Sequence, residues 1–405
     1  MKYDIGIVGA GTAGAASALL LARAGHRVTL FERVADPMPV GAGILIQPTG
    51  MAVLDQLGML EEAIALGARI DRLYGQNERG RRVMDMTYCD WRPGSFGLGM
   101  HRGALFTLLQ RQLVPDGVIC RYGVNIAAMQ WRVDKTVLCD AEGHEHGAFD
   151  VIVAADGMRS QMRAISGLPA TVTPYPWGAV WTICEDATGV FNGVLNQRYR
   201  AAREMLGILP TGTSATGGVP LVSLFWSLRT ADFAAWQQQG LDAWKRQALH
   251  LWPELEDLLG GLTQTAPLPQ LRFADYCDVV MPQWHGDGIV VVGDAAHATS
   301  PQLGQGANLA LLDAHFLQRA LAASGSIREA LQCYSGERRA HLRYYQWASR
   351  MLTPLFQSDQ RILPALRDAF MGTVGRLPYV KTQFAETLAG TKTGIVFGRL
   401  KLPGE

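Results

Sequence analysis

The glycine-rich segment near the N-terminus constrains the fold more than any other feature of the chain. Gly9, Gly11 and Gly14 follow an apolar, strand-like run. A helix-like stretch, 15–24, comes next, and a second apolar run then ends in Glu32. In a strand–turn–helix–strand unit, such glycines permit a tight turn, close approach of the backbone to a pyrophosphate and close packing of helix on strand. Glu32 follows the last glycine by about 18 residues, as expected for a carboxylate that binds ribose hydroxyls, so the segment predicts a parallel α/β unit that binds a dinucleotide.

Residues that flank this motif are expected to line the same site. Thr12 and Ala13 lie at the helix start, where a pyrophosphate would meet unpaired N–H groups. Arg33 follows the ribose-binding carboxylate, and Gly43 and Ile44 lie in a second glycine-rich loop after the second strand. The motif alone does not separate NAD from FAD.

A second glycine-rich segment identifies the ligand more closely. It begins with Gly293 and Asp294, directly after the apolar run 289–292. Pro301 follows, and then a string that opens a predicted helix: Gly304, Gln305, Gly306, Ala307 and Asn308. A helix start offers unpaired N–H groups and the positive end of the helix dipole, which suit a ligand edge that becomes negative, such as the pyrimidine edge of a reduced flavin. The Asp294 carboxylate can accept hydrogen bonds from the hydroxyls of a ribityl chain, so this segment favours FAD over NAD.

Composition limits the classes of protein that remain. The chain has 405 residues, 48% apolar and 18% charged, which indicates a globular protein of two or three domains. A net charge of +1, without a long basic run, gives no reason to expect a nucleic-acid partner. The six cysteines form no C-x-x-C pair, so we expect no metal site and a reducing, cytoplasmic location. No apolar run other than 5–24 approaches the ~20 residues of a membrane span, and that run lacks the basic start of a signal peptide.

Two shorter features add candidate contacts. Arg102 opens the predicted helix 103–113, where its guanidinium either pairs with a pyrophosphate or is solvated. Asp156 and Gly157 follow a buried-type strand and can form a turn, with Ser160 capping the next helix. Taken alone, such a turn is more often structural than functional.

The pattern of apolar and polar residues changes over residues 174–272. Alternating, aromatic-rich segments there predict the antiparallel strands of a second sheet. Trp181, Met205 and Phe225 lie in these segments. Their side chains either line a pocket for a flat ring or pack in the core.

In this order, the three motifs resemble those of the class A flavoprotein monooxygenases, the para-hydroxybenzoate hydroxylase type. The first glycine motif with Glu32 matches the ADP-binding motif of that family. The pair at 156–157 is similar to its DG motif, and the segment from Gly293 is similar to its GD motif. Arg102 falls where the family places an arginine that contacts the pyrophosphate. The resemblance extends to about residue 320.

The sequence departs from the family pattern at two places. Leu312 precedes Asp313 where many members carry a Glu-Asp pair, which removes a role for a carboxylate at the first position and leaves the flavin site intact. Gln47-Pro48 differs from the commoner Pro-Asn, so the contacts there are not carried over.

The resemblance implies an α/β fold with three parts. They are a Rossmann-like FAD-binding domain, a substrate domain with a mixed or antiparallel sheet, and a helical C-terminus. The expected FAD-binding domain comprises 1–75, 100–173 and 276–340, the substrate-binding domain 76–99 and 174–275, and the helical region 341–405. Toward the C-terminus, the sequence pattern predicts helices over 314–351, across the boundary at 340, and over 362–371. The C-terminal helices either cover the flavin domain or support a homodimer.

The resemblance also implies a reaction. NAD(P)H reduces the flavin, which reacts with O₂ to give a C4a-hydroperoxide that hydroxylates a small aromatic or heteroaromatic substrate. Pro301 is expected to turn close to that substrate. His297 is either a catalytic base or, as the motif favours, a residue that fixes the loop.

Two other interpretations stay open. One is a flavin enzyme of the same fold that inserts no oxygen, or a halogenase, although the W-x-W-x-I-P string of halogenases is absent. The other is a binding protein that keeps the scaffold without chemistry. The intact glycines, Glu32 and Asp294 argue against the second, since a scaffold without cofactor has no need of them.

Overall fold

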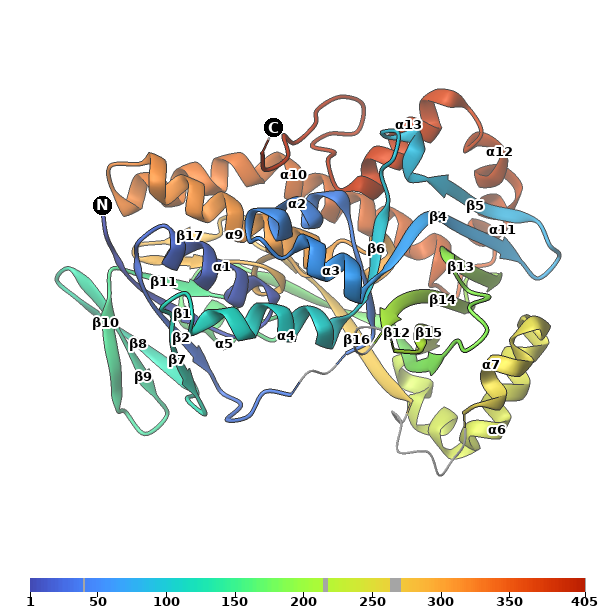
Figure 1. Cartoon of the computed structure of the whole chain (residues 1–405), viewed down its shortest axis with the longest axis horizontal. Coiled ribbons are helices and arrows are strands. Elements are labelled where there is room, and N and C mark those ends of the chain that lie inside the picture. Colours follow the sequence, from blue (N-terminus) through green and yellow to red (C-terminus); the bar gives the residue numbers. More distant parts are fainter. Residues whose placement is uncertain (39–40, 214–217, 263–270, 405) are drawn as a thin grey trace.

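A six-stranded sheet carries the N-terminal glycine motif (Figure 1). The computed structural model describes residues 1–38, 41–213, 218–262 and 271–404. In this sheet the strand order is β17–β18–β11–β1–β2–β7, with bounds His285–Gly286, Ile289–Val291, Val151–Ala154, Asp4–Val8, Arg27–Glu32 and Ile119–Tyr122. β1 pairs in parallel with β2 and β11, whereas β17 pairs antiparallel with β18. The central strands are almost fully buried, which explains why their sequences are continuous apolar runs.

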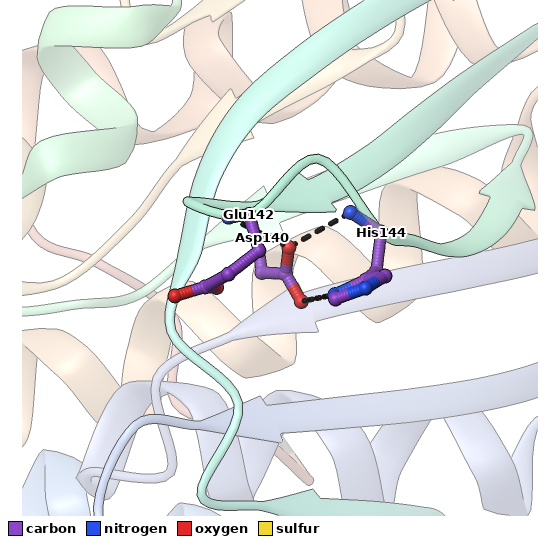
Figure 2. A group of neighbouring side chains, drawn as sticks. All are labelled: Asp140, Glu142 and His144. Carbon is purple, nitrogen blue, oxygen red and sulfur yellow. Dashed lines mark hydrogen bonds and ion pairs between the residues drawn. The ribbon is translucent and has the colours of Figure 1, made fainter.

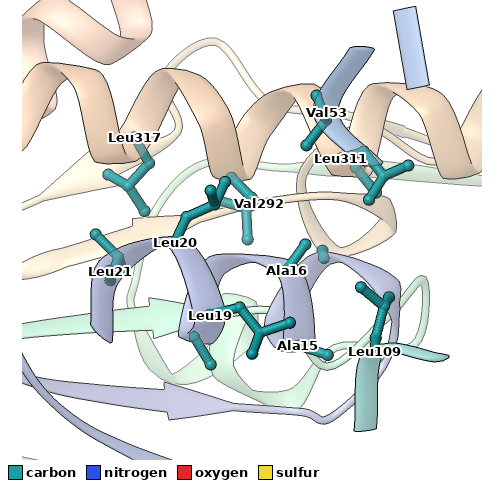
Figure 3. Packing of buried hydrophobic residues seen from close by; sticks show 14 of the residues in the cluster. Ala15, Ala16, Leu19, Leu20, Leu21, Val53, Leu109, Val292, Leu311 and Leu317 are labelled. Atoms are coloured by element: carbon teal, nitrogen blue, oxygen red, sulfur yellow. The ribbon is translucent and has the colours of Figure 1, made fainter. Parts of the chain in front are cut away.

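Helix α1 (Thr12–Arg23) connects β1 to β2 and lies at the centre of the first core cluster (Figure 3). Its small residues Ala15 and Ala16 and its leucines pack with side chains of α4 (Arg102–Leu113) and α9 (Gly306–Ala323). Four further helices are short: α2 (Pro48–Gln56), α3 (Leu60–Leu66), α5 (Gln161–Ile165) and α8 (Asp294–His297). Because α1 is apolar on nearly all sides, it is stable only when enclosed in this way.

A small antiparallel sheet, absent from the sequence-based expectations, lies between β7 and β11 in the chain. It consists of β8 (Ile126–Arg132), β9 (Lys135–Asp140) and β10 (Glu145–Phe149). At the β9–β10 turn the Asp140 carboxylate accepts hydrogen bonds from the backbone N–H groups of Glu142 and His144 and from His144 Nδ1, at 3.1, 2.8 and 3.1 Å (Figure 2). A further bond from His146 is the main reason that the pKa of Asp140 is lowered to about 2. These bonds close a tight turn, which accounts for the grouping of the side chains.

The second large sheet is built from segments far apart in the sequence. Its order is β16–β12–β15–β14–β13–β4–β6–β3, with β5 beside β4. The bounds are β3 Gly43–Ile46, β4 Ala68–Asn77, β5 Arg82–Thr87, β6 Gly97–His101, β12 Thr171–Glu185, β13 Gly193–Arg200, β14 Glu204–Thr213, β15 Pro220–Arg229 and β16 Arg272–Val280. Most neighbours are antiparallel, but β13 pairs in parallel with β4, so the sheet is mixed, as predicted. β3 lies before residue 75 and β4 begins before it, yet both belong to this sheet, so strand pairing does not follow the expected domain boundary.

The two faces of the second sheet have different neighbours. Val180, Leu224 and Trp226 pack with α6 (Phe233–Leu251) and α7 (Glu256–Gly260) in a separate core cluster. On the other face, Ser223 Oγ accepts a hydrogen bond from the Gly43 N–H at 3.0 Å. That face therefore lies toward the glycine-rich loops of the first part of the chain.

The C-terminal region is helical, but its helices differ from those expected. The helix predicted over 314–351 is interrupted at residues 324–326, where α9 ends and α10 (Ile327–Phe356) begins. Ser326 explains the break, because its side chain caps α10 by accepting a hydrogen bond from the Glu329 N–H at 3.3 Å. The remaining helices are α11 (Ile362–Leu366), the π-helical turn Arg367–Met371, α12 (Gly372–Val374) and α13 (Pro378–Ala389). Within the described residues, no helix combines the length and apolar character needed to cross a bilayer.

Candidate functional site

The three glycines of the N-terminal motif differ in their surroundings. A Cβ on Gly9, whose φ is +101°, would lie 2.5 Å from the Ala155 carbonyl oxygen. A Cβ on Gly14 would lie 1.8 Å from the Gly9 carbonyl oxygen, so the protein itself requires both glycines. Gly11 precedes α1 and has nothing within 4 Å of the same position. The space in front of α1 is therefore open, as a pyrophosphate at the helix N-terminus requires.

The Glu32 carboxylate holds the glycine turn from the end of β2. It accepts hydrogen bonds from the backbone N–H groups of Ala10 and Val34, both at 3.0 Å. A carboxylate has about four lone-pair sites, so Glu32 keeps capacity for ribose hydroxyls. Of the flanking candidates, Arg33 is exposed and Thr12 half-buried, whereas Ala13 is buried.

Arg102 lies beside the loop that leads to Gly43 and Ile44. Its side-chain carbons are 2.6–3.0 Å from the position that a Cβ on Gly41 would take, so only glycine fits there. The Arg102 side chain is exposed at the start of α4, and its guanidinium makes no ion pair with the described part of the chain. The charge is therefore available to an anionic ligand.

The turn at Asp156 and Gly157 serves the fold through its carboxylate. Asp156 accepts hydrogen bonds from the N–H groups that begin α5, at 2.8 and 3.0 Å, and from the Ser160 hydroxyl. Gly157 has a φ of +81° and open space around it. The buried Arg163 donates to the Ala295 carbonyl at 2.7 Å and so ties this turn to α8.

The two glycine-rich segments meet at Gly293. A Cβ on Gly293, whose φ is +60°, would lie 2.7 Å from Ala13 Cβ at the start of α1. Asp294 follows with an exposed side chain, 3.7 Å from the position of a Cβ on Gly306. The structure thus brings the starts of α1 and α9 together, with the Asp294 carboxylate between them and unpaired within the described residues.

Asn308 fixes the loop that opens α9. It is fully buried; its Oδ1 accepts from the Gln47 N–H at 2.8 Å, and its Nδ2 donates to the carbonyls of Leu45 and Gly304, both at 3.0 Å. The Gln47 side chain accepts from the Tyr88 hydroxyl at 2.6 Å, and its buried Nε2 has no partner. This donor lies 3.8 Å from the position of a Cβ on Gly304. A buried, unused donor beside free helix-start N–H groups fits a ligand edge that carries acceptors.

His297 and Pro301 occupy different environments. His297 is only 2% exposed, and its Nε2 lies 2.6 Å from Asp313 Oδ2, which also accepts from the Gly293 N–H at 2.8 Å. Arg338 donates through Nε to the other carboxylate oxygen at 2.8 Å. Burial acts to raise the pKa of Asp313, but the charges of His297 and Arg338 hold it well below its ordinary value. Pro301, by contrast, is exposed at the start of a short 3₁₀ turn, Pro301–Leu303.

Arg338, one of the three partners of Asp313, was not predicted from the sequence. No sequence motif marks Arg338, which lies in the middle of α10. The one signal that could have pointed to it is an arginine on the face of α10 that is buried. His297 was expected either to fix the loop or to act as a base. Its burial against Asp313 supports the first role, and a catalytic role stays a prediction.

The three candidate pocket residues lie on one face of the second sheet. Trp181 and Phe225 are direct cross-strand partners. Gly207 pairs with Phe225 from the other side, and Met205, two residues before Gly207, therefore points to the same face. This is the face on which Ser223 meets the Gly43 loop. Trp181 and Phe225 are half-buried, whereas Met205 is buried in a cluster with Tyr199 and Phe356, and its place in a pocket stays a prediction.

Comparison with known proteins agrees with this geometry. The FAD binding domain family matches residues 2–346, so the chain belongs to that family. It is 27% identical over 402 residues to 6-methylpretetramide 4-monooxygenase of Streptomyces rimosus, covering 96% of this chain and 93% of that protein. It is 28% identical over 363 residues to salicylate hydroxylase of Pseudomonas putida, covering 83% and 82% of the two chains.

Solved structures show the same fold. HpxO of Klebsiella pneumoniae, complexed with FAD and uric acid, has a TM-score of 0.79 at 18% identity and covers 97% of this chain and 98% of that chain. The tetrameric form of 2-methyl-3-hydroxypyridine-5-carboxylic acid oxygenase has a TM-score of 0.77 at 22% identity, with coverage of 94% and 95%. The family, relatives and fold confirm the predicted resemblance to class A flavoprotein monooxygenases, the FAD cofactor and an aromatic hydroxylase as the class of enzyme.

Replacing Gly11 with alanine separates binding from folding. The added methyl group enters open space, so we expect the free energy of unfolding of the apoprotein to change by less than about 0.5 kcal/mol while FAD binding weakens. Gly14→Ala is the matched control; its methyl group meets the Gly9 carbonyl and should cost about 1–3 kcal/mol of stability. Urea unfolding and FAD titration measure the two effects. Unchanged FAD affinity in Gly11→Ala would show that the pyrophosphate lies elsewhere.

Proposed function

We propose that this enzyme uses NAD(P)H and O₂ to hydroxylate a small aromatic or heteroaromatic compound, with FAD held between the starts of α1 and α9. The observation that carries the proposal is the meeting of Gly293 with Ala13, which places the free Asp294 carboxylate beside both helix starts. Bound FAD, once reduced, supplies the chemistry that activates oxygen. The protein supplies binding, orientation and exclusion of water.

Each free group of the site has a proposed partner on FAD. Glu32 accepts from ribose hydroxyls, and Arg102 with the N–H groups around Gly11 binds the pyrophosphate. Asp294 accepts from the ribityl hydroxyls. The helix start at 304–308 and the unused Gln47 amide donor meet the acceptor edge of the pyrimidine ring and stabilise negative charge there.

The substrate is proposed to lie between the Pro301 turn and the sheet face of Trp181 and Phe225. Both rings are half-buried, and they offer flat apolar surface to an aromatic compound. Names such as salicylate hydroxylase and 6-hydroxynicotinate 3-monooxygenase support a hydroxylated ring of modest size. We also propose that His297 fixes the loop through its bond to Asp313 and that a phenolic proton leaves by a route that does not use this histidine.

Isotope labelling tests the function. Purified protein with FAD and NAD(P)H is supplied with ¹⁸O₂ and a panel of phenols, hydroxybenzoates and hydroxypyridines. We expect one compound to accelerate NAD(P)H oxidation and to gain one ¹⁸O atom, detected by mass spectrometry. Accelerated oxidation with hydrogen peroxide but no labelled product, for every compound, would favour an oxidase of the same fold. A protein that cannot be reconstituted with FAD would refute the flavin assignment itself.

Asp294→Ala tests the ribityl contact. Loss of hydrogen bonds from a charged acceptor should weaken FAD binding by about 1.5–3 kcal/mol, read from titration of the apoprotein. Asp287→Ala is the control, since Asp287 is also an exposed aspartate, with a side chain 88% exposed, and it lies away from the glycine loops. Equal FAD affinity in both variants would contradict the assignment.

We further propose a homodimer that forms through the C-terminal helices. Ile362, Leu366, Phe370 and Val374 recur every four residues and are 73, 47, 59 and 42% exposed, which makes one apolar stripe. A solved structure of the same fold is a tetramer, which supports self-association through some face.

Light scattering tests this surface. The unchanged protein is expected to elute at twice its monomer mass of 44.1 kDa, and Phe370→Ser at the monomer mass. Val133→Ser, at a fully exposed position in the β8–β9 turn, should leave the dimer intact. A monomeric unchanged protein would contradict the proposed dimer.

The location is proposed to be cytoplasmic. All six cysteines are free, and three of them are buried. Free thiols in this number support a reducing compartment.

A further inference from the structure

The chain beyond residue 346 lies outside the family match, yet its last helix reaches the candidate flavin loop. Gln305, directly before α9, donates through Nε2 to the carbonyls of Leu388 and Thr387 at 2.8 and 3.3 Å. Leu388 is buried in a cluster with Leu45 and Tyr88, the neighbours of the Gln47 loop. The end of α13 therefore contacts both loops that frame the pyrimidine end of the proposed site.

Gly390 makes the closest approach. It ends α13 in the left-handed conformation, with a φ of +90°, and is buried. A Cβ there would lie 2.2 Å from the hydroxyl oxygen of Thr49, at the start of α2. Thr49 is fully buried and β-branched, so it has little freedom to move aside. The chain can cross α2 at this distance only as glycine.

Helix α10 holds the same segment from behind. The Tyr345 hydroxyl donates to the Thr387 carbonyl at 2.8 Å, and the Tyr344 hydroxyl lies 2.6 Å from Thr387 Oγ1. His341 Nε2 lies 2.7 Å from the Gly390 carbonyl oxygen. Three side chains of one helix thus fix the end of α13.

His341 also connects this segment to the Gly293 turn. Arg338 Nη1 lies 2.7 Å from His341 Nδ1, and Arg338 Nε donates to Asp313, which accepts from the Gly293 N–H. Arginine can only donate, so Nδ1 of His341 is unprotonated and Nε2 donates to the Gly390 carbonyl. Burial, and then the charge of Arg338, lower the pKa of His341 to about 3, in agreement with a neutral ring.

We propose that residues 387–390 form a clamp that sets the position of the flavin loops, with Gln305 and His341 as positioning residues. The clamp accepts hydrogen bonds from Gln305 and packs closely against Thr49 through Gly390. It is joined to the Gly293 turn through His341 and Arg338. Asp313, Arg338 and His341, which form this last connection, are all buried. Because water cannot replace their hydrogen bonds, a shift of one of these side chains would displace the next. The inference rests on the proposed placement of the flavin between these loops.

Gly390→Ala tests the clamp against a matched glycine. Gly25 has the same φ of +90° but nothing within 4 Å of a Cβ, so Gly25→Ala carries the backbone strain without the collision. FAD titration of both apoproteins and the visible circular dichroism of the bound flavin are the readouts. Gly390→Ala should bind FAD about tenfold more weakly with an altered flavin spectrum, the scale of one lost buried hydrogen bond, and Gly25→Ala within about twofold of the unchanged protein.

Rescue distinguishes positioning from general damage. Thr49→Ala removes the hydroxyl that the new methyl group would meet, so Thr49→Ala/Gly390→Ala should recover FAD affinity and spectrum. His341→Phe leaves the Gly390 carbonyl without its hydrogen-bond donor. Although residue 341 is not placed in contact with FAD, this change should alter the flavin spectrum. Wild-type affinity and spectrum in both Gly390→Ala and His341→Phe would overturn the clamp. Failure of the unchanged protein to bind FAD would instead refute the proposed function.

Discussion

The buried carboxylate of Asp313 is the interaction on which the site depends. An ion in the protein interior is costly unless donors surround it, and Asp313 receives donors from the Gly293 N–H, His297 and Arg338. These three come from the turn after β18, from α8 and from α10. One side chain therefore sets where the glycine turn lies relative to the C-terminal helix, and Asp294 projects from that turn. Removing any of these donors would leave the buried negative charge of Asp313 with fewer hydrogen bonds to stabilise it.

The polar residues of the three motifs divide into those already bonded and those still free. The carboxylates of Asp156 and Asp313 accept hydrogen bonds from backbone and side-chain donors of the protein, and the imidazole of His297 is one of the donors to Asp313. Asp294 and the Arg102 guanidinium have no such partners among the described residues, and both are exposed. Polar groups that fix the shape of a site are hydrogen-bonded within the protein, whereas polar groups that bind a ligand are free before it binds. On this criterion the free groups mark the path of the cofactor, and the bonded groups mark its support.

The sequence allowed the local units to be predicted, because turn, helix start and strand are encoded within about 30 residues. The glycine motif, Asp294 and the helix near Ala307 were placed in this way. Strand partners could not be placed, since β4 pairs with β13, which lies more than a hundred residues further along the chain. The break before α10 depended on one cap, Ser326, within a continuous helical pattern. Arg338 and His341 carried no motif, and their role arises only from what α10 packs against.

A fixed protonation state makes the buried connection suited to holding position. Asp313 is ionised because its donors lower its pKa, and His341 is neutral because burial and Arg338 lower its pKa to about 3. Near neutral pH neither group changes charge, so protons taken up or released at the flavin do not alter the bonds between the Gly293 turn and Gly390. If FAD binds as proposed, the loops that carry its contacts would stay in place when its charge changes. On the proposal of a clamp, α13 supports the flavin site from a part of the chain that lies beyond the family match.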